Sequence, residues 1–156
     1  MQPRQLDVCY IPSTPDVVTA MLAVAEVSAK DILYDLGCGD GRVAIAAAKN
    51  FGTRCVGIDI DPIRIQEAQE NARKAQVTDL VQFYQGNLFN SNFREATVIT
   101  LYLLPHLNLR LRSQFFPQLQ PGTKIVSHDF DMGDWEPQKV LNLDNEAESI
   151  IYYWLI

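Results

Sequence analysis

A glycine-rich segment at residues 35–41, Asp-Leu-Gly-Cys-Gly-Asp-Gly, lies between a short apolar run and a segment with helical periodicity. Glycine lets the backbone turn sharply and approach a ligand, because no Cβ stands in the way. The helix that follows offers free backbone N–H groups at its N-terminus. A strand, a glycine loop and a helix in this order predict the first unit of an α/β domain with a ligand at the loop.

The rest of the chain repeats this alternation of apolar runs and helix-period segments. A first helix is expected after Thr14 and Pro15, since Pro is favoured at the first helical position. We expect strands at 32–36, 55–60, 80–85, 96–102 and 124–129, and helices at 41–50, 61–74 and 105–119. The last two runs, 139–143 and 149–156, predict an antiparallel hairpin. The predicted fold is a doubly wound, mostly parallel, seven-stranded α/β sheet closed by that hairpin.

Charge and composition exclude several classes of protein. The net charge is −6, and Arg110 and Arg112 are the nearest approach to a basic patch, so non-specific binding of nucleic acid is not expected. The three cysteines form no Cys-x-x-Cys pair, and we expect neither a disulfide framework nor a metal site. No apolar run approaches the roughly 20 residues that span a bilayer, and no signal-peptide core follows the N-terminus. We therefore expect a cytoplasmic protein without membrane insertion.

Two acids narrow the choice of ligand. Asp59 ends the second predicted strand, where a carboxylate can accept hydrogen bonds from both ribose hydroxyls of a nucleoside. The third glycine of a dinucleotide fingerprint is missing, because Arg42 stands at that position and Gly41 comes one residue early. Asp35 opens the loop, and its charge would repel pyrophosphate but attract an ammonium or sulfonium group. The two acids together indicate a ligand that is a nucleoside with a cationic tail, and S-adenosylmethionine fits this description.

These motifs resemble the class I, Rossmann-like S-adenosylmethionine-dependent methyltransferases. The resemblance rests on residues 35–41, Asp59 and residues 86–89, and extends from about residue 10 to the end of the chain. Residues 10–14, 128–130 and 135–137 are similar to small protein-lysine methyltransferases, whose mitochondrial members modify an ATP synthase subunit and the adenine nucleotide translocase. The chain is then expected to be one methyltransferase domain. Residues 1–30 would form an N-terminal segment and helix, 31–130 the cofactor-binding core, and 131–156 the hairpin.

The resemblance implies roles for the cofactor-binding residues. The methionine end would be held by a first group, and the nucleoside by a second. The first comprises Tyr10, Thr14, Asp35, Gly37 and Gly39; the second comprises Asp59, Ile60, Asn87 and Leu88. Cys38, inside the loop, is a further cofactor-binding candidate, although a small residue that fits the turn is the simpler interpretation. The family usually has Asp where this chain has Asn87, which still offers a carbonyl acceptor. A turn is an equally good interpretation of Asn87.

Residues after the fourth and fifth strands are candidates for the acceptor site. Tyr102 could orient an amine through its hydroxyl group, although a packed aromatic is an equally good interpretation. His128, Asp129 and Asp131 could shape the same site, and Asp129 is the second catalytic candidate. The Asn/Asp-Pro-Pro-aromatic signature of many nucleic-acid amino-methyltransferases is absent, so no DNA substrate is expected.

These observations predict a methyltransferase that acts on a lysine side chain of a protein. The chain is close to the minimal length for this fold, with no insertion that would enclose a small substrate. A small-molecule or RNA methyltransferase stays open as an alternative, and so does a non-catalytic module that only binds S-adenosylmethionine.

The sequence also makes a prediction about the hydrophobic core: Phe115 and Phe116 are both expected to be buried.

Overall fold

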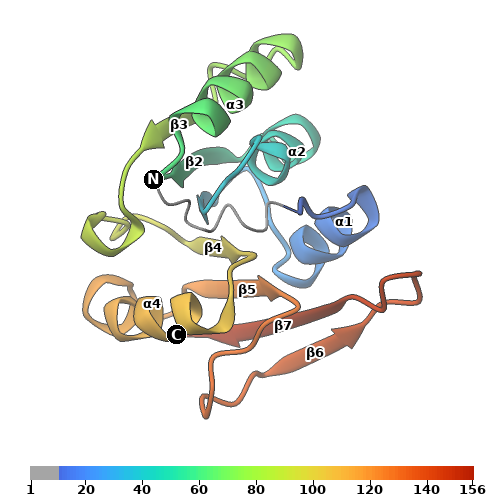
Figure 1. Ribbon diagram of the computed structural model, residues 1–156, viewed down its shortest axis with the longest axis vertical. Helices are drawn as coiled ribbons and strands as arrows, with labels where there is room; N and C mark the ends of the chain where they lie inside the picture. Colours follow the sequence, from blue (N-terminus) through green and yellow to red (C-terminus); the bar gives the residue numbers. More distant parts are fainter. Residues whose placement is uncertain (1–10) are drawn as a thin grey trace.

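The computed structural model describes residues 11–156, and its centre is a seven-stranded sheet with the strand order β3-β2-β1-β4-β5-β7-β6. Figure 1 shows the sheet with helices on both sides. The strands are β1 (Ile32–Leu36), β2 (Arg54–Asp59), β3 (Val81–Gln85), β4 (Val98–Leu101), β5 (Lys124–His128), β6 (Lys139–Asn142) and β7 (Ile150–Leu155). The helices are α1 (Pro15–Val24), α2 (Arg42–Phe51), α3 (Pro62–Lys74), α4 (Pro105–Gln118) and the short 3-10 helix η2 (Leu88–Asn90).

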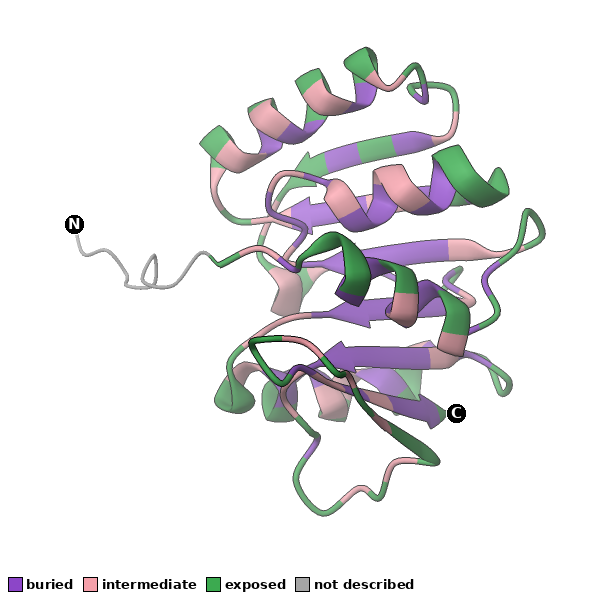
Figure 2. Ribbon diagram, turned by 90° about the vertical axis from the view of Figure 1, so that its right-hand side faces the viewer, coloured by how far each residue is buried: buried purple, intermediate pink, exposed green. Residues whose placement is uncertain are grey.

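The sheet is parallel from β3 to β5 and antiparallel at β7 and β6. Every predicted strand and helix is present, with ends shifted by no more than a few residues, and the C-terminal hairpin is confirmed. In Figure 2 the arrowheads of the parallel strands point to the same side. The loops that follow these strands therefore meet at one edge of the sheet, which is where open α/β sheets bind ligands.

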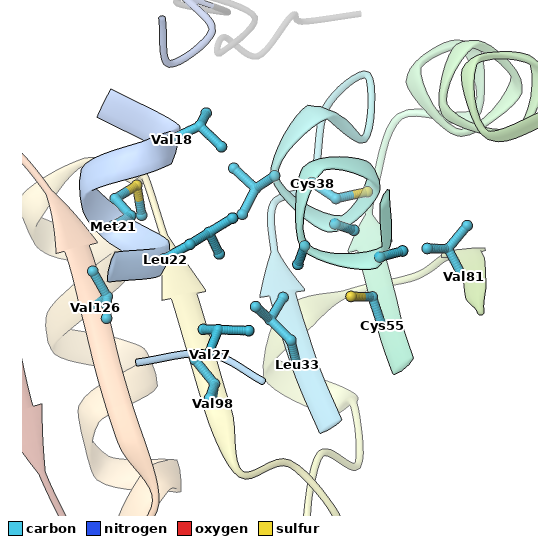
Figure 3. Close-up of a cluster of buried hydrophobic side chains, with 14 of the residues drawn as sticks. Val18, Met21, Leu22, Val27, Leu33, Cys38, Cys55, Val81, Val98 and Val126 are labelled. Atoms are coloured by element: carbon cyan, nitrogen blue, oxygen red, sulfur yellow. The ribbon is translucent and has the colours of Figure 1, made fainter. Parts of the chain in front are cut away.

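Two hydrophobic clusters cover the two faces of the sheet. The first packs α1, α2 and α3 against one face, and Figure 3 shows residues such as Met21, Leu33 and Val98 within it. The second cluster includes Leu111 and Phe115 of α4. The central strands β1 and β4 are mostly apolar because both of their faces are covered, whereas the edge strand β3 alternates buried and exposed residues.

The prediction that Phe116 is buried was wrong. Phe115 is fully buried, whereas the Phe116 side chain is 53% exposed and contacts Trp135, with a distance of 4.9 Å between the ring centroids. Leu111 and Phe115 are four residues apart and lie on one face of α4, while the next residue points about 100° away from that face. Helical geometry therefore allows only one of the two adjacent phenylalanines into the core.

The C-terminal strand β7 lies between β5 and β6 and is covered by aromatic contacts. Trp154 is buried, and its indole N–H donates to the carbonyl oxygen of Trp135 over 2.8 Å. Tyr152 stacks on Trp154 at 5.9 Å between ring centroids. Trp135 thus covers this end of the sheet.

Among residues 11–156 no helix is both long and apolar enough to cross a membrane.

Candidate active site

The glycine loop between β1 and α2 depends on backbone angles that side chains disfavour. Gly37, Gly39 and Gly41 all have positive φ, at 83°, 55° and 84°. The N–H groups of Gly37 and Cys38 both donate to the carbonyl oxygen of Ile58, over 2.8 and 3.0 Å. The loop is therefore pinned to β2, with a bare main chain available to a ligand.

Asp59, at the end of β2, holds this loop in place. Its Oδ2 accepts a hydrogen bond of 2.9 Å from the N–H of Gly39, and its Oδ1 accepts one of 3.0 Å from the N–H of Asp61. A carboxylate has about four lone-pair sites, so both oxygens can still accept from hydroxyl groups. The position and chemistry of Asp59 fit the ribose of a nucleoside, and its contact with a ribose stays a prediction.

Asp35 is the buried acid of the site. Its side chain lies on β1, and its Oδ1 accepts a hydrogen bond of 2.9 Å from the hydroxyl of Thr100 on β4. Burial raises the pKa of Asp35 to about 7, and the nearby charges of Asp59 and Asp40 add to this effect. A cationic group beside the carboxyl would stabilise its charged form. This acid set fits a ligand with a positively charged tail.

The residues predicted to contact the nucleoside follow β2 and β3. Ile60 is 66% exposed and Leu88 is half-buried, so both offer apolar surface for a ring. Asn87 caps the helix η2, because its Oδ1 accepts a hydrogen bond of 2.9 Å from the N–H of Phe89. The turn interpretation of Asn87 therefore describes its local geometry, and its contact with adenine stays a prediction.

The helix α4 contacts the loop that follows β3. The Arg110 guanidinium lies 3.6 Å from the centroid of the Phe89 ring. The amide of Gln114 donates to the carbonyl oxygen of Phe89 over 2.9 Å. Arg112 forms an ion pair with Asp134. Arg110 and Arg112, the two residues that come closest to forming a basic patch in the sequence, are thus engaged with other side chains of the protein.

Three aromatic rings are layered at the ends of β4 and β5. Tyr102 stacks on His128 with 3.8 Å between the ring centroids, and Phe130 lies beyond Tyr102 at 6.2 Å. Tyr102 and Phe130 are half-buried, whereas His128 is only 4% exposed. This stack forms an aromatic wall at the same edge of the sheet as the glycine loop. A role of this wall in binding the methyl acceptor stays a prediction.

Asp129 links the end of β5 to the first residue of β7. Its φ of 67° is unusual for a residue other than glycine. Its Oδ1 accepts a hydrogen bond of 3.0 Å from the N–H of Ile150, and its Oδ2 lies 3.5 Å from Nε2 of His128. The carboxylate thereby joins β5 to the start of β7, and a direct role in catalysis stays a prediction.

The N-terminal candidates are placed only in part. Tyr10 lies outside the described residues. Thr14 is exposed at the start of α1, and its hydroxyl donates to the carboxylate of Asp16. The contact of Thr14 with the methionine tail stays a prediction.

Ser13 and Arg42, two residues that lie beside the glycine loop, had no role predicted from the sequence. Ser13 is buried and bonds to His128, while its carbonyl oxygen accepts from Nη1 of Arg42 over 3.0 Å. Arg42 also forms a bidentate ion pair with Asp40 in the glycine loop. The position of Arg42 directly after the loop was the one signal that could have suggested its role.

The chain matches known methyltransferases over most of its length. The family model of the ANTKMT methyltransferase domain matches residues 35–139. A relative from Saccharolobus islandicus, named protein-lysine N-methyltransferase, is 42% identical over 149 residues, which cover 94% of this chain and 92% of that protein. The adenine nucleotide translocase lysine N-methyltransferase of Mus musculus is 24% identical, and the match covers 89% of this chain but 60% of the mouse protein.

A solved structure gives the same picture of the fold and adds a ligand. The structure from Salinibacter ruber, described as an RNA methyltransferase in complex with S-adenosyl-L-homocysteine, has 51% sequence identity and a TM-score of 0.90, with 94% of each chain covered. Fold and site together define a class I S-adenosylmethionine-dependent methyltransferase. Within this class, the chain belongs to the family of the ANTKMT methyltransferase domain.

Proposed function

We propose that this chain transfers a methyl group from S-adenosylmethionine to the side chain of a lysine in a protein substrate. When bound, S-adenosylmethionine supplies a methyl group on a positively charged sulfur. The observation that carries the proposal is the aromatic wall of Tyr102, His128 and Phe130, which lies at the same edge of the sheet as the glycine loop. Similarity to a protein-lysine N-methyltransferase along almost the whole chain supports the choice of acceptor.

The aromatic wall suits the acceptor in two ways. A lysine side chain has an apolar stem, which can pack on ring faces while its amine reaches the site. Removal of the amine from water lowers its pKa and favours the neutral, nucleophilic form. No dedicated base is then required, because displacement at an activated carbon depends mainly on alignment, and alignment can remove roughly 7–11 kcal/mol of the barrier.

A second candidate function is methylation of RNA, because the similar structure from Salinibacter ruber is described as an RNA methyltransferase. The charge of this chain argues against it, since the net charge is −6 and Arg110 and Arg112 are engaged with Phe89 and Asp134. RNA binding depends largely on cations that meet phosphate groups.

The test is methyl transfer from labelled S-adenosylmethionine into separate pools of protein and RNA. We expect label in protein, at lysine residues identified by mass spectrometry of peptides. A matched protein pool with all lysine amines blocked by acetylation should take up no label. Label in RNA, or equal label in the blocked and unblocked protein pools, would overturn the proposal. Cofactor binding without transfer to either pool would instead support the non-catalytic module.

A further inference from the structure

Ser13 joins the cofactor side of the site to the acceptor side. Its hydroxyl oxygen lies 2.8 Å from Nδ1 of His128, a residue 115 positions away in the chain. Its carbonyl oxygen accepts from Arg42, which is bound to Asp40 in the glycine loop. Both Ser13 and His128 are buried, at 5% and 4% exposure. Ser13 therefore links the loop after β1, through Arg42, to the end of β5, through His128.

The His128 ring is held on several sides. Ser13 bonds to Nδ1, and the Asp129 carboxylate lies 3.5 Å from Nε2. One face of the ring stacks on Tyr102 with an interplanar angle of 29°. With Nε2 protonated toward Asp129, Nδ1 accepts the hydrogen bond from the Ser13 hydroxyl. Each ring nitrogen then has a polar neighbour, and the ring plane is defined.

We propose that His128, held by Ser13, is a positioning residue that fixes the plane of Tyr102 and thereby aims the acceptor amine at the methyl group. The inference rests on the proposed function. His128 does not touch the reacting atoms in this role; it acts through Tyr102. Because a displacement of about 1 Å in a bound reactant can cost about a hundredfold in rate, a loose Tyr102 ring would slow transfer without loss of cofactor.

Three substitutions separate the two contacts of His128. Ser13→Ala removes the hydroxyl group that bonds to Nδ1. His128→Phe keeps a ring to stack on Tyr102 but loses the bond to Ser13. His128→Asn keeps a polar atom near the place of Nδ1 but loses the ring. The matched control is Ser113→Ala, because Ser113 is exposed on α4 and its hydroxyl donates to the carbonyl oxygen of Arg110.

The experiment measures kcat and KM for methyl transfer, the Kd of S-adenosylhomocysteine by calorimetry, and the melting temperature of each variant. We expect all three variants to lose about tenfold or more in kcat, whereas the Kd stays within about twofold of wild type and the control is unchanged. Removal of one partner of a buried hydrogen bond costs about 1–3 kcal/mol of stability, less than the stability of a typical domain, so Ser13→Ala should remain folded.

Wild-type kcat in all three variants would overturn the inference. So would losses in kcat that follow equal losses in cofactor affinity or melting temperature, since a purely structural bond would act through the fold. The proposed function is tested separately by the wild-type chain. If wild type transfers no methyl group to lysine, the proposed function fails; if it does and the variants match it, only the positioning role fails.

Discussion

The hydroxyl of Thr100 donates a hydrogen bond of 2.9 Å to the buried carboxyl group of Asp35. The two residues are register partners on the neighbouring strands β4 and β1. The strand order changes direction between β1 and β4. This is the point at which doubly wound sheets bind ligands. Burial of the Asp35 carboxylate there, without a cationic partner, costs the free protein stability.

Asp35→Asn should stabilise the free protein at alkaline pH. The folded-state pKa of about 7 lies above the ordinary value of 3.8, so the folded state binds the Asp35 proton more tightly than the unfolded state. The resulting stability is present below about pH 4 and is lost as the pH rises to about 7. Asn stays neutral and can still accept from Thr100. We expect the melting temperature of the variant, relative to wild type, to rise by about 5 °C between pH 5 and pH 8.

The control for this prediction is Asp79→Asn, at an exposed position in the turn before β3. Its melting temperature relative to wild type should not change between the two pH values. A constant difference between Asp35→Asn and wild type across this range would show that Asp35 does not titrate as its burial indicates.

Asp59→Asn should weaken cofactor binding. One carboxylate oxygen is replaced by an N–H donor, which cannot accept from a ribose hydroxyl or from the N–H of Gly39. Hydrogen bonds to charged groups contribute about 1.5–3 kcal/mol, so the Kd of S-adenosylhomocysteine should rise by about tenfold or more. Calorimetry measures this Kd directly.

Asp61→Asn is the matched control for Asp59→Asn. It removes the same charge two residues away, and Asn can replace Asp61 as the cap that accepts from the N–H of Ile63. Its Kd should stay near that of wild type. If both variants weaken binding equally, the effect comes from net charge at this edge of the sheet and not from a contact of Asp59 with the cofactor.

The order of strands and helices could be predicted because local signals agree with the fold. Leu33 and Leu36 of β1 are fully buried, since helices cover both faces of the sheet, and such a strand has an apolar sequence. Asp61 and Pro62 mark the start of α3, where the Asp61 side chain accepts from the N–H of Ile63. Each signal lies within a few residues of the feature that it predicts.

Contacts across the fold could not be predicted in this way. The bond between Ser13 and His128 joins residues 115 positions apart, and no local pattern encodes such a pair. The capping role of Asn87 and the contact of Asp129 with Ile150 likewise depend on where loops meet. The sequence identified most candidate positions at this edge, but which polar atoms are already engaged became visible only in three dimensions.

Gly41→Ala should destabilise the fold by about 2–4 kcal/mol, through both backbone and packing. The φ of Gly41 is +84°, and an added Cβ would lie 2.7 Å from Cζ of Phe83 and 3.0 Å from Cβ of Ala68. Gly122→Ala is the matched control, because its φ is +95° but, apart from its two chain neighbours, no residue described in the structure has an atom within 4 Å of the added Cβ. Urea unfolding should therefore show the smaller loss, about 1 kcal/mol, for the control. Equal losses would remove the packing part of this explanation.

Truncation of the two adjacent phenylalanines of α4 should have very different effects. Phe115 is fully buried and Phe116 is 53% exposed. Phe115→Ala should cost about 3–5 kcal/mol, the range for large core side chains, since it leaves a cavity. Phe116→Ala should cost about 1 kcal/mol, mainly through its contact with Trp135. Free energies of unfolding in urea test the difference, and similar costs for the two variants would contradict the observed orientation of α4.

Tyr102→Phe should lower turnover by about three- to tenfold and leave cofactor affinity unchanged. The ring that stacks on His128 is kept, so the aromatic wall remains and only the hydroxyl group is lost. A neutral hydrogen bond contributes about 0.5–1.5 kcal/mol, which sets the size of the expected effect on kcat. Steady-state kinetics with a lysine-containing protein, together with the Kd of S-adenosylhomocysteine, measure both quantities.

The matched control is Tyr84→Phe, because Tyr84 is 52% exposed and its hydroxyl donates to Oε1 of Gln82 on the same strand. This variant should keep wild-type kcat and Kd. Full activity of Tyr102→Phe would mean that Tyr102 acts only as a packed ring, the second interpretation of this residue. Because that ring is also the surface that His128 holds, substitutions of His128 would then still slow transfer while loss of the Tyr102 hydroxyl would not.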